Sequence, residues 1–273
     1  MSLPGGAEAP DFVVSPDGTR IAVWRSGGGR PLVLVHGTTA DHTTWRTVGP
    51  LLASTHTVIA IDRRGRGASG DTPPYDIARE EEDVAAVAEH ALATIGGPVT
   101  VLGHSYGGRC VLGAGLLTEA IDRLVVYEGP VTRDSFGETE EIAAELDLLL
   151  AEGEPERVLE VFMRRVVKVT DEEWDAFRSS ETFLLRVLAA HTIIRELRSG
   201  IGDRGDIERF RSVRQPVLQI VGGASDARFA AAASALADAL PDGRLVVIDG
   251  ARHAAHHTHP DRFVTAVTDF TGS

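Results

Sequence analysis

The chain has 273 residues, of which 43% are hydrophobic and 25% are charged, and its formal net charge is −13. This length fits one large domain with room for an insertion, and the negative charge argues against nucleic acid or an anionic membrane surface as the main partner. The single cysteine, Cys110, excludes an intramolecular disulfide and is expected to be a small buried residue. With neither a signal-peptide pattern nor an apolar run of roughly 20 residues, we expect a cytoplasmic protein that does not enter the membrane.

The first part of the chain predicts a hairpin followed by alternating strands and helices. Residues 12–14 and 20–24 flank Ser15-Pro-Asp-Gly18, which is a turn signature. Short apolar runs then predict buried strands at 31–35, 56–61, 99–102 and 123–127. Helical patterns separate them at about 42–53, 76–95 and 106–117. This alternation indicates parallel strands joined by right-handed crossovers.

The alternation stops between residues 129 and 213. Only helical patterns occur there, at 140–152, 155–167, a short stretch after Thr170, and 183–198. Thr170 and Glu173 have the spacing of a capping box at the start of the third helix. Strands return at 217–221 and 244–248, each followed by a helix, at 228–240 and 260–270.

The sequence Gly103-His-Ser-Tyr-Gly107 follows the apolar run 99–102 and precedes a helical stretch. G-x-S-x-G between a strand and a helix forms a sharp turn that exposes the serine at a helix N-terminus. The flanking positions must be glycine because a Cβ there would collide with neighbouring backbone. Ser105 is therefore the candidate nucleophile, and His104 beside it is interpreted as a packing and hydrogen-bonding residue.

These residues resemble the α/β-hydrolase superfamily over almost the whole chain. The resemblance implies an α/β fold with a mostly parallel eight-stranded sheet, an N-terminal hairpin, and helices on both faces. It also divides the chain into a core domain of residues 1–128 and 214–273 and an all-helical lid of residues 129–213. Asp62-x-x-Gly-x-Gly-x-Ser69 is interpreted as a structural turn of this family rather than a phosphate-binding loop, because it lacks the P-loop pattern.

The resemblance also implies a Ser-acid-His triad in that chain order. His253, after the last strand, occupies the position of the family's histidine. Asp226, after the preceding strand, occupies the usual position of the acid. Glu128, at the end of the strand before the lid, is the alternative acid. Asp249 is close to His253 in the sequence but follows its strand too early to be the acid.

The oxyanion hole is expected to consist of the backbone N–H groups of Thr38 and Tyr106. A substrate pocket is expected to include lid residues, with Phe162, Trp174, Phe183 and His191 as candidates, although such a stripe is more often core. The i, i+4 spacing of His253 and His257 raises a metal site as an alternative, but no ligand set completes it. His256, His257 and His259 are expected to be exposed or to lie at a helix start. No metal or cofactor is expected.

The leading hypothesis is a serine hydrolase, most simply a carboxylic-ester hydrolase, that cleaves a small, largely uncharged ester or related acyl compound through an acyl-enzyme. C–C bond hydrolysis, lactone hydrolysis, perhydrolysis and lyase chemistry on the same triad remain open, as does a non-catalytic small-molecule receptor. The expected partner is a small-molecule substrate, and the sequence does not indicate an oligomeric state.

Overall fold

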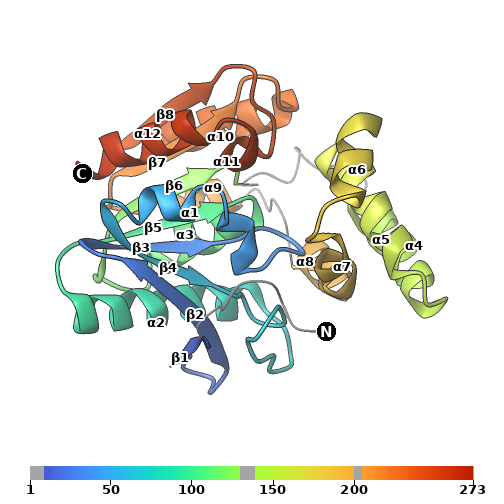
Figure 1. The fold of residues 1–273 in the computed structure, drawn as a ribbon, viewed down its shortest axis with the longest axis horizontal. Coiled ribbons are helices and arrows are strands. Elements are labelled where there is room, and N and C mark those ends of the chain that lie inside the picture. The colour runs from blue at the N-terminus through green and yellow to red at the C-terminus, as the bar shows by residue number, and fades with distance from the viewer. Residues whose placement is uncertain (1–8, 130–138, 200–204, 273) are drawn as a thin grey trace.

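The computed structural model describes residues 9–129, 139–199 and 205–272. Its centre is an eight-stranded sheet in the order β1-β2-β4-β3-β5-β6-β7-β8 (Figure 1). β2 pairs antiparallel with β1 and β4, and the remaining pairs are parallel. The strands are β1 (Asp11–Val14), β2 (Arg20–Gly27), β3 (Arg30–Val35), β4 (His56–Ile61), β5 (Val99–His104), β6 (Ile121–Tyr127), β7 (Val217–Gly222) and β8 (Gly243–Ile248).

Helices cover both faces of this sheet. One hydrophobic cluster contains residues of α2 (Ile77–Ile95), α3 (Tyr106–Ala114) and α10 (Ala227–Ala239). A second cluster on the other face contains residues of η1 (His42–Trp45), α1 (Gly49–Leu52), α11 (Ala255–Thr258) and α12 (Pro260–Thr271). The fold is therefore the predicted α/β-hydrolase architecture, and the strand order brings the ends of β3, β5, β6 and β7 next to one another.

Several predicted helices are shorter or divided. The single helix expected over 42–53 consists of η1 and α1, and the stretch 183–198 divides into α7 (Phe183–Leu188) and α8 (His191–Arg198). The predicted helix 155–167 begins as α5 (Pro155–Val161) and continues as a π-helical turn, η3 (Phe162–Val167). The Thr170–Glu173 capping box is present at the start of α6 (Asp171–Arg178). Among the described residues, no helix is both long and apolar enough to cross a bilayer.

Most helices between β6 and β7 lie at one end of the sheet (Figure 1). They are α4 (Thr139–Ala151), α5, α6, α7 and α8. The last helix before β7, α9 (Gly205–Phe210), packs against the core instead, where Arg209 pairs with Glu81 of α2. α8 joins this segment to the core, because the fully buried Glu196 contacts the guanidinium groups of Arg63 and Arg66. Both arginines belong to the loop that follows β4.

The loop after β4 is a rigid turn held by its own side chains. The Asp62 carboxylate accepts hydrogen bonds from the backbone N–H groups of His42 and Ala68, and the Ser69 hydroxyl donates to the Asp62 carbonyl. A Cβ on Gly67 would lie 1.8 Å from the Asp62 carboxylate. These contacts agree with the structural interpretation of this loop.

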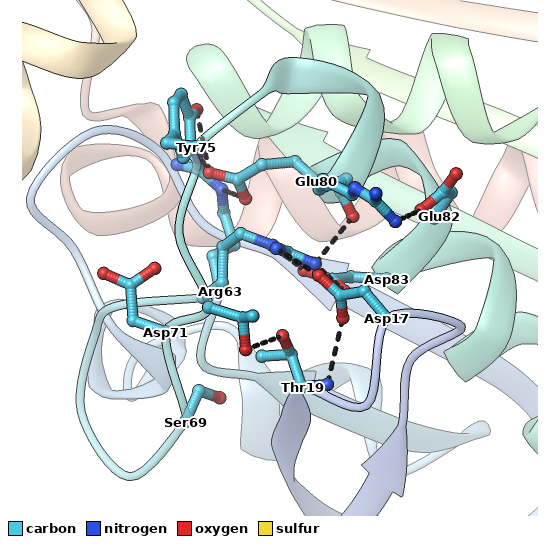
Figure 2. A network of polar contacts seen from close by, with 12 residues as sticks. Asp17, Thr19, Arg63, Ser69, Asp71, Tyr75, Glu80, Glu82 and Asp83 are labelled. Carbon is cyan, nitrogen blue, oxygen red and sulfur yellow. Dashed lines mark hydrogen bonds and ion pairs between the residues drawn. The ribbon is translucent and has the colours of Figure 1, made fainter.

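A buried polar network lies beneath the same loop (Figure 2). Arg63 donates two hydrogen bonds to Glu80 of α2, at 2.9 and 2.7 Å, and the Tyr75 hydroxyl donates to the same carboxylate at 3.0 Å. Burial alone would raise the pKa of Glu80, but the charges of Arg63 and Arg66 outweigh it and lower that pKa to about 2. The network therefore keeps Glu80 ionised in the interior.

Candidate active site

Ser105 occupies a strained turn between β5 and α3. Its backbone has φ 53° and ψ −125°, a conformation that costs free energy in a non-glycine residue. A Cβ on Gly103 would lie 2.3 Å from the Gly107 carbonyl oxygen, and one on Gly107 would lie 2.4 Å from that of His36. The two glycines therefore allow β5, α3 and β3 to approach closely enough to hold this turn.

His253 meets a carboxylate at the end of β6. Its Nδ1 lies 2.5 Å from Oε2 of Glu128, and since a carboxylate only accepts, Nδ1–H is the donor. The second Glu128 oxygen, Oε1, accepts a hydrogen bond from the Gly222 N–H at 2.7 Å. The side chain of Glu128 is fully buried, so its carboxylate is shielded from water. Because Glu128 contacts Nδ1, the other ring nitrogen of His253, Nε2, makes no contact with Glu128.

Three neighbouring side chains contact the loop that carries His253. The Tyr127 hydroxyl donates to the Arg252 carbonyl at 2.5 Å and accepts from the Ala255 N–H at 2.8 Å. Phe229 stacks on the His253 ring with centroids 4.7 Å apart. His104 contacts the same loop through Nε2, which donates to the His253 carbonyl at 2.9 Å. Burial and the charge of His253 hold the pKa of His104 well below its usual range, so this neutral ring orients the loop.

Asp226, the acid favoured by the sequence, does not make this contact. Its carboxylate caps α10 by accepting the Arg228 N–H at 3.0 Å, and it pairs with the Arg228 guanidinium at 2.8 Å and with Lys168 at 3.5 Å. Burial opposes these contacts, but together they lower the pKa of Asp226. The structure thus brings Glu128, and not Asp226, to His253.

Thr38 and Tyr106 belong to two segments that meet at Ser105. A Cβ on Gly37 would lie only 3.0 Å from the Ser105 Cβ, so the loop after β3 passes directly beside Ser105. Tyr106 is the first residue of α3, and its side chain is anchored away from the turn by hydrogen bonds to Tyr75 and Ser199, at 3.0 and 2.6 Å. Both backbone N–H groups are therefore carried by segments that meet at Ser105.

A cavity of about 370 Å³ joins these elements, and both Ser105 and His253 line it. The structure contains no hydrogen bond between these two described side chains, a contact that often tightens only when substrate binds. Apolar side chains from the helical segment and α10 line the same cavity. Its size suits a small molecule.

The four predicted pocket residues have different places in the structure. Phe162 lines the cavity, because the π-helical turn η3 carries it there. Trp174 and Phe183 pack with Phe177 in an aromatic cluster and do not line the cavity. His191 is exposed, with Nδ1 donating to the Leu188 carbonyl at 2.9 Å. The structure does not bring these last three to the cavity, because a helical stripe of aromatic residues also packs against its own neighbours.

Other side chains also line the cavity. Met163, Val167, Phe177 and Phe229 supply apolar wall, and Arg186 supplies a cation. Sequence reasoning missed Val167, Phe229 and Arg186. Val167 ends the π-helical turn that begins at Phe162, and no periodicity pattern predicts the extra residue per turn of such a helix. Arg186 gave no signal, because a lone arginine on a short helix resembles any surface residue.

Two of the histidines after His253 lie at the start of α11 rather than at the surface. His256 is the second residue of that helix and is buried against the rings of Trp45, His104 and His257. Burial holds its pKa well below the usual range, and burial with the charges of Arg46 and Arg186 lowers the pKa of His257 to about 4. Both rings are therefore neutral.

One cluster among the described residues has the spacing of metal ligands, formed by Asp41, His42 and Asp62. Its carboxylates already serve the fold: Asp41 caps η1 by accepting the Thr43 N–H at 2.9 Å, and Asp62 holds the turn described above. Cys110 is buried, as expected, and burial raises the pKa of its thiol to about 12.

Comparison with known proteins identifies relatives along the whole chain. The sequence model described as the alpha/beta hydrolase family matches residues 32–266. A solved alpha/beta hydrolase from Sphaerobacter thermophilus is 34% identical with a TM-score of 0.82, covering 96% of this chain and 100% of that one. The esterase RhEst1 from Rhodococcus is 26% identical with a TM-score of 0.76, covering 97% and 99%.

Curated relatives include larger proteins. A probable oxidoreductase, EphD, from Mycobacterium tuberculosis is 38% identical over 110 residues, which are 38% of this chain and 18% of that protein. The chain thus spans less than a fifth of the length of the first curated relatives it matches.

Proposed function

Because the chain belongs to the alpha/beta hydrolase family, we propose that it is a serine hydrolase that cleaves a small ester or related acyl compound through Ser105, His253 and Glu128. The observation that carries the proposal is the contact of His253 with the buried Glu128, because His253 lines the same cavity as Ser105. A serine hydroxyl needs such a base, and the base needs a third group that fixes its tautomer.

In this mechanism Glu128 holds the proton of His253 on Nδ1, so that Nε2 is the acceptor. Nε2 removes the Ser105 proton as Oγ attacks the carbonyl carbon of the substrate. The resulting oxyanion accepts hydrogen bonds from the N–H groups of Thr38 and Tyr106. His253 then protonates the leaving group, and water, activated by the same ring, releases the acid from the acyl-enzyme.

The segment α4–α9 serves as a lid in this proposal. It supplies Phe162, Met163 and Phe177 to the cavity wall, which excludes water around the acyl group. Asp226 then has a structural role, because its contact with Lys168, at the end of η3, joins the core to the lid. Arg252 makes a second connection by pairing with Glu173 of α6 at 2.9 Å.

The proposal is tested by labelling with a fluorophosphonate, followed by intact-mass measurement and mapping of the adduct. We expect one adduct on Ser105 and none in Ser105→Ala. His253→Ala should slow labelling by about 10²-fold or more, since it removes the general base. His191→Ala is the matched control, because that histidine is exposed and lies outside the cavity, and its labelling rate should be unchanged.

Absence of an adduct on folded wild-type protein would contradict the proposal and favour a non-catalytic receptor. Equal labelling of wild type and His253→Ala would show that the histidine does not activate the serine. Hydrolysis of p-nitrophenyl esters of increasing acyl length then measures the size of the acyl group that the cavity accepts.

A further inference from the structure

Arg186 of α7 brings a positive charge into the cavity that contains Ser105 and His253. Its charge contributes to the lowered pKa of His36, His104, His256 and His257, all of which lie around the serine turn or the histidine loop. Because Arg186 lines the same cavity as Ser105 and His253, it is placed to contact a small substrate bound there.

Arg186 differs in its pairing from the buried arginines of the core. Within the described residues no carboxylate oxygen lies within 4.0 Å of it, and its one hydrogen bond goes to the Thr44 hydroxyl at 3.1 Å. Arg63 pairs with Glu80 and Glu196 instead. Burial, with the nearby charge of Arg46, lowers the pKa of Arg186 to about 10, and the charge of Asp41 only partly offsets this. It stays protonated at neutral pH.

The partner of Arg186 does not neutralise its charge. The Thr44 hydroxyl, which accepts from Arg186, lies 3.4 Å from Nε2 of the buried His256. His256 is neutral because burial depresses its pKa. Within the described part of the chain, Arg186 is therefore hydrogen-bonded only to Thr44, which in turn contacts the neutral His256. The remaining N–H donors of the guanidinium are available to another acceptor.

The acidic residues near the cavity are already engaged. Glu173 pairs with Arg252, and Asp226 pairs with Arg228 and Lys168. Asp41, whose charge reaches Arg186, accepts the N–H and the hydroxyl of Thr43 through Oδ1 and forms no ion pair with Arg186. The complement to Arg186 is thus expected to come from the bound molecule.

We propose that Arg186 binds a carboxylate group of the substrate, so that the enzyme acts on acyl compounds that carry one negative charge away from the scissile carbonyl. A planar guanidinium suits a carboxylate because it donates two parallel hydrogen bonds. The cavity then holds the acyl chain between Arg186 and Ser105. This inference rests on the proposed function and replaces the largely uncharged substrate that the sequence favoured.

The decisive experiment compares the monomethyl esters of succinic, glutaric and adipic acid with their neutral half-amide methyl esters. Wild type should hydrolyse the best-fitting monoester with kcat/KM about 10- to 100-fold above that of its half-amide, as expected for one charged hydrogen-bonded contact. Arg186→Met should reduce this ratio to about one, chiefly through the carboxylate substrate, and Arg186→Lys should retain part of it. Arg244→Met is the matched control and should keep the wild-type ratio. Arg244 is an exposed arginine of β8 that pairs with Asp242, outside the cavity.

Two further measurements separate this inference from the proposed function. Calorimetry with Ser105→Ala reports binding without turnover: binding of the monoester but not the half-amide, lost when Arg186→Met is added, supports the carboxylate site even where no ester is hydrolysed. Equal binding of both ligands, or an unchanged ratio in Arg186→Met, overturns it. The melting temperature of Arg186→Met should equal or exceed that of wild type, since a charge without a carboxylate partner is removed; a clear loss would indicate that Asp41 is its structural partner.

Discussion

The two carboxylate oxygens of Glu128 have different partners, and this defines what the residue can do. Oε1 is fixed by the Gly222 N–H of β7, and Oε2 faces Nδ1 of His253. The backbone of Glu128 has φ 47°, a left-handed conformation that turns the chain sharply at the end of β6. A strained backbone, a buried charge and one histidine partner together are typical of a functional position.

Replacing the two candidate acids separately tests the triad assignment at the scale of single residues. Glu128→Gln keeps an oxygen for the Gly222 N–H but no longer fixes the His253 tautomer, so we expect kcat/KM on p-nitrophenyl acetate to fall by about 10⁴-fold. Asp226→Asn should stay close to wild type, because that carboxylate contacts Arg228 and Lys168 rather than the histidine. The reverse order of losses would return the role of the acid to Asp226. Melting temperatures of both variants show whether each still folds.

At the scale of elements, the sequence was most informative where local chemistry decides the structure. Apolar runs bounded by turn residues predicted every strand, and the capping box at Thr170 predicted the start of α6. G-x-S-x-G located the serine turn because only glycine tolerates the contacts found at residues 103 and 107. Each of these signals lies within a few residues of the feature that it predicts.

Features that depend on contacts between distant elements could not be predicted in the same way. Glu128 and Asp226 both follow parallel strands, and their order in the chain does not reveal which carboxylate turns toward His253. The choice depends on the left-handed backbone of Glu128 and on the Lys168 contact of Asp226, which only the folded chain shows. Likewise, the π-helical turn η3 decides that Phe162 faces the cavity.

The joint between β5 and α3 provides a test of how closely these elements are packed. A Cβ in Gly103→Ala would meet the backbone of Gly107 and Gly108, so α3 must shift. Overpacking of this kind costs about 1 to 3 kcal/mol, and we expect a melting temperature lower by about 2–10 °C with a larger loss of Ser105 labelling. Gly28→Ala is the matched control, since a Cβ there has nothing within 4 Å. Equal stability and labelling in both variants would refute the close packing.

At the scale of the whole molecule, charged contacts connect the helical segment to the core at two places. At the first, the fully buried Glu196 of α8 contacts Arg63 and Arg66. At the second, Glu173 pairs with Arg252 in the loop that carries His253. Buried pairs resist separation far more than exposed ones, so we expect α8 to stay fixed while the segment near α6 moves when ligands enter.

The buried network at Glu80 makes a prediction about the stability of the whole fold. The pKa of Glu80 is lowered from 4.5 to about 2, so its stabilising contribution is complete above pH 4.5 and is lost as the pH falls toward 2. The shift corresponds to a contribution on the order of 3 kcal/mol at neutral pH. Urea unfolding of Glu80→Gln should therefore show a large loss of unfolding free energy at pH 7 that shrinks steadily between pH 4.5 and the acid limit.

Glu82→Gln is the control for that experiment, because Glu82 lies on the same helix and forms only a partly exposed pair with Arg79 at 3.2 Å (Figure 2). Its unfolding free energy should follow that of wild type at every pH, since such surface pairs contribute little. A gap between wild type and Glu80→Gln that stays constant from pH 7 to pH 3 would mean that packing, and not the charge of Glu80, stabilises the network. If the difference in unfolding free energy between wild type and Glu80→Gln instead disappears at low pH, protonation of Glu80 accounts for the acid sensitivity of the fold. Because Arg63 and Arg66 contact both Glu80 and Glu196 of α8, acid would then weaken the core and its contact with the helical segment together.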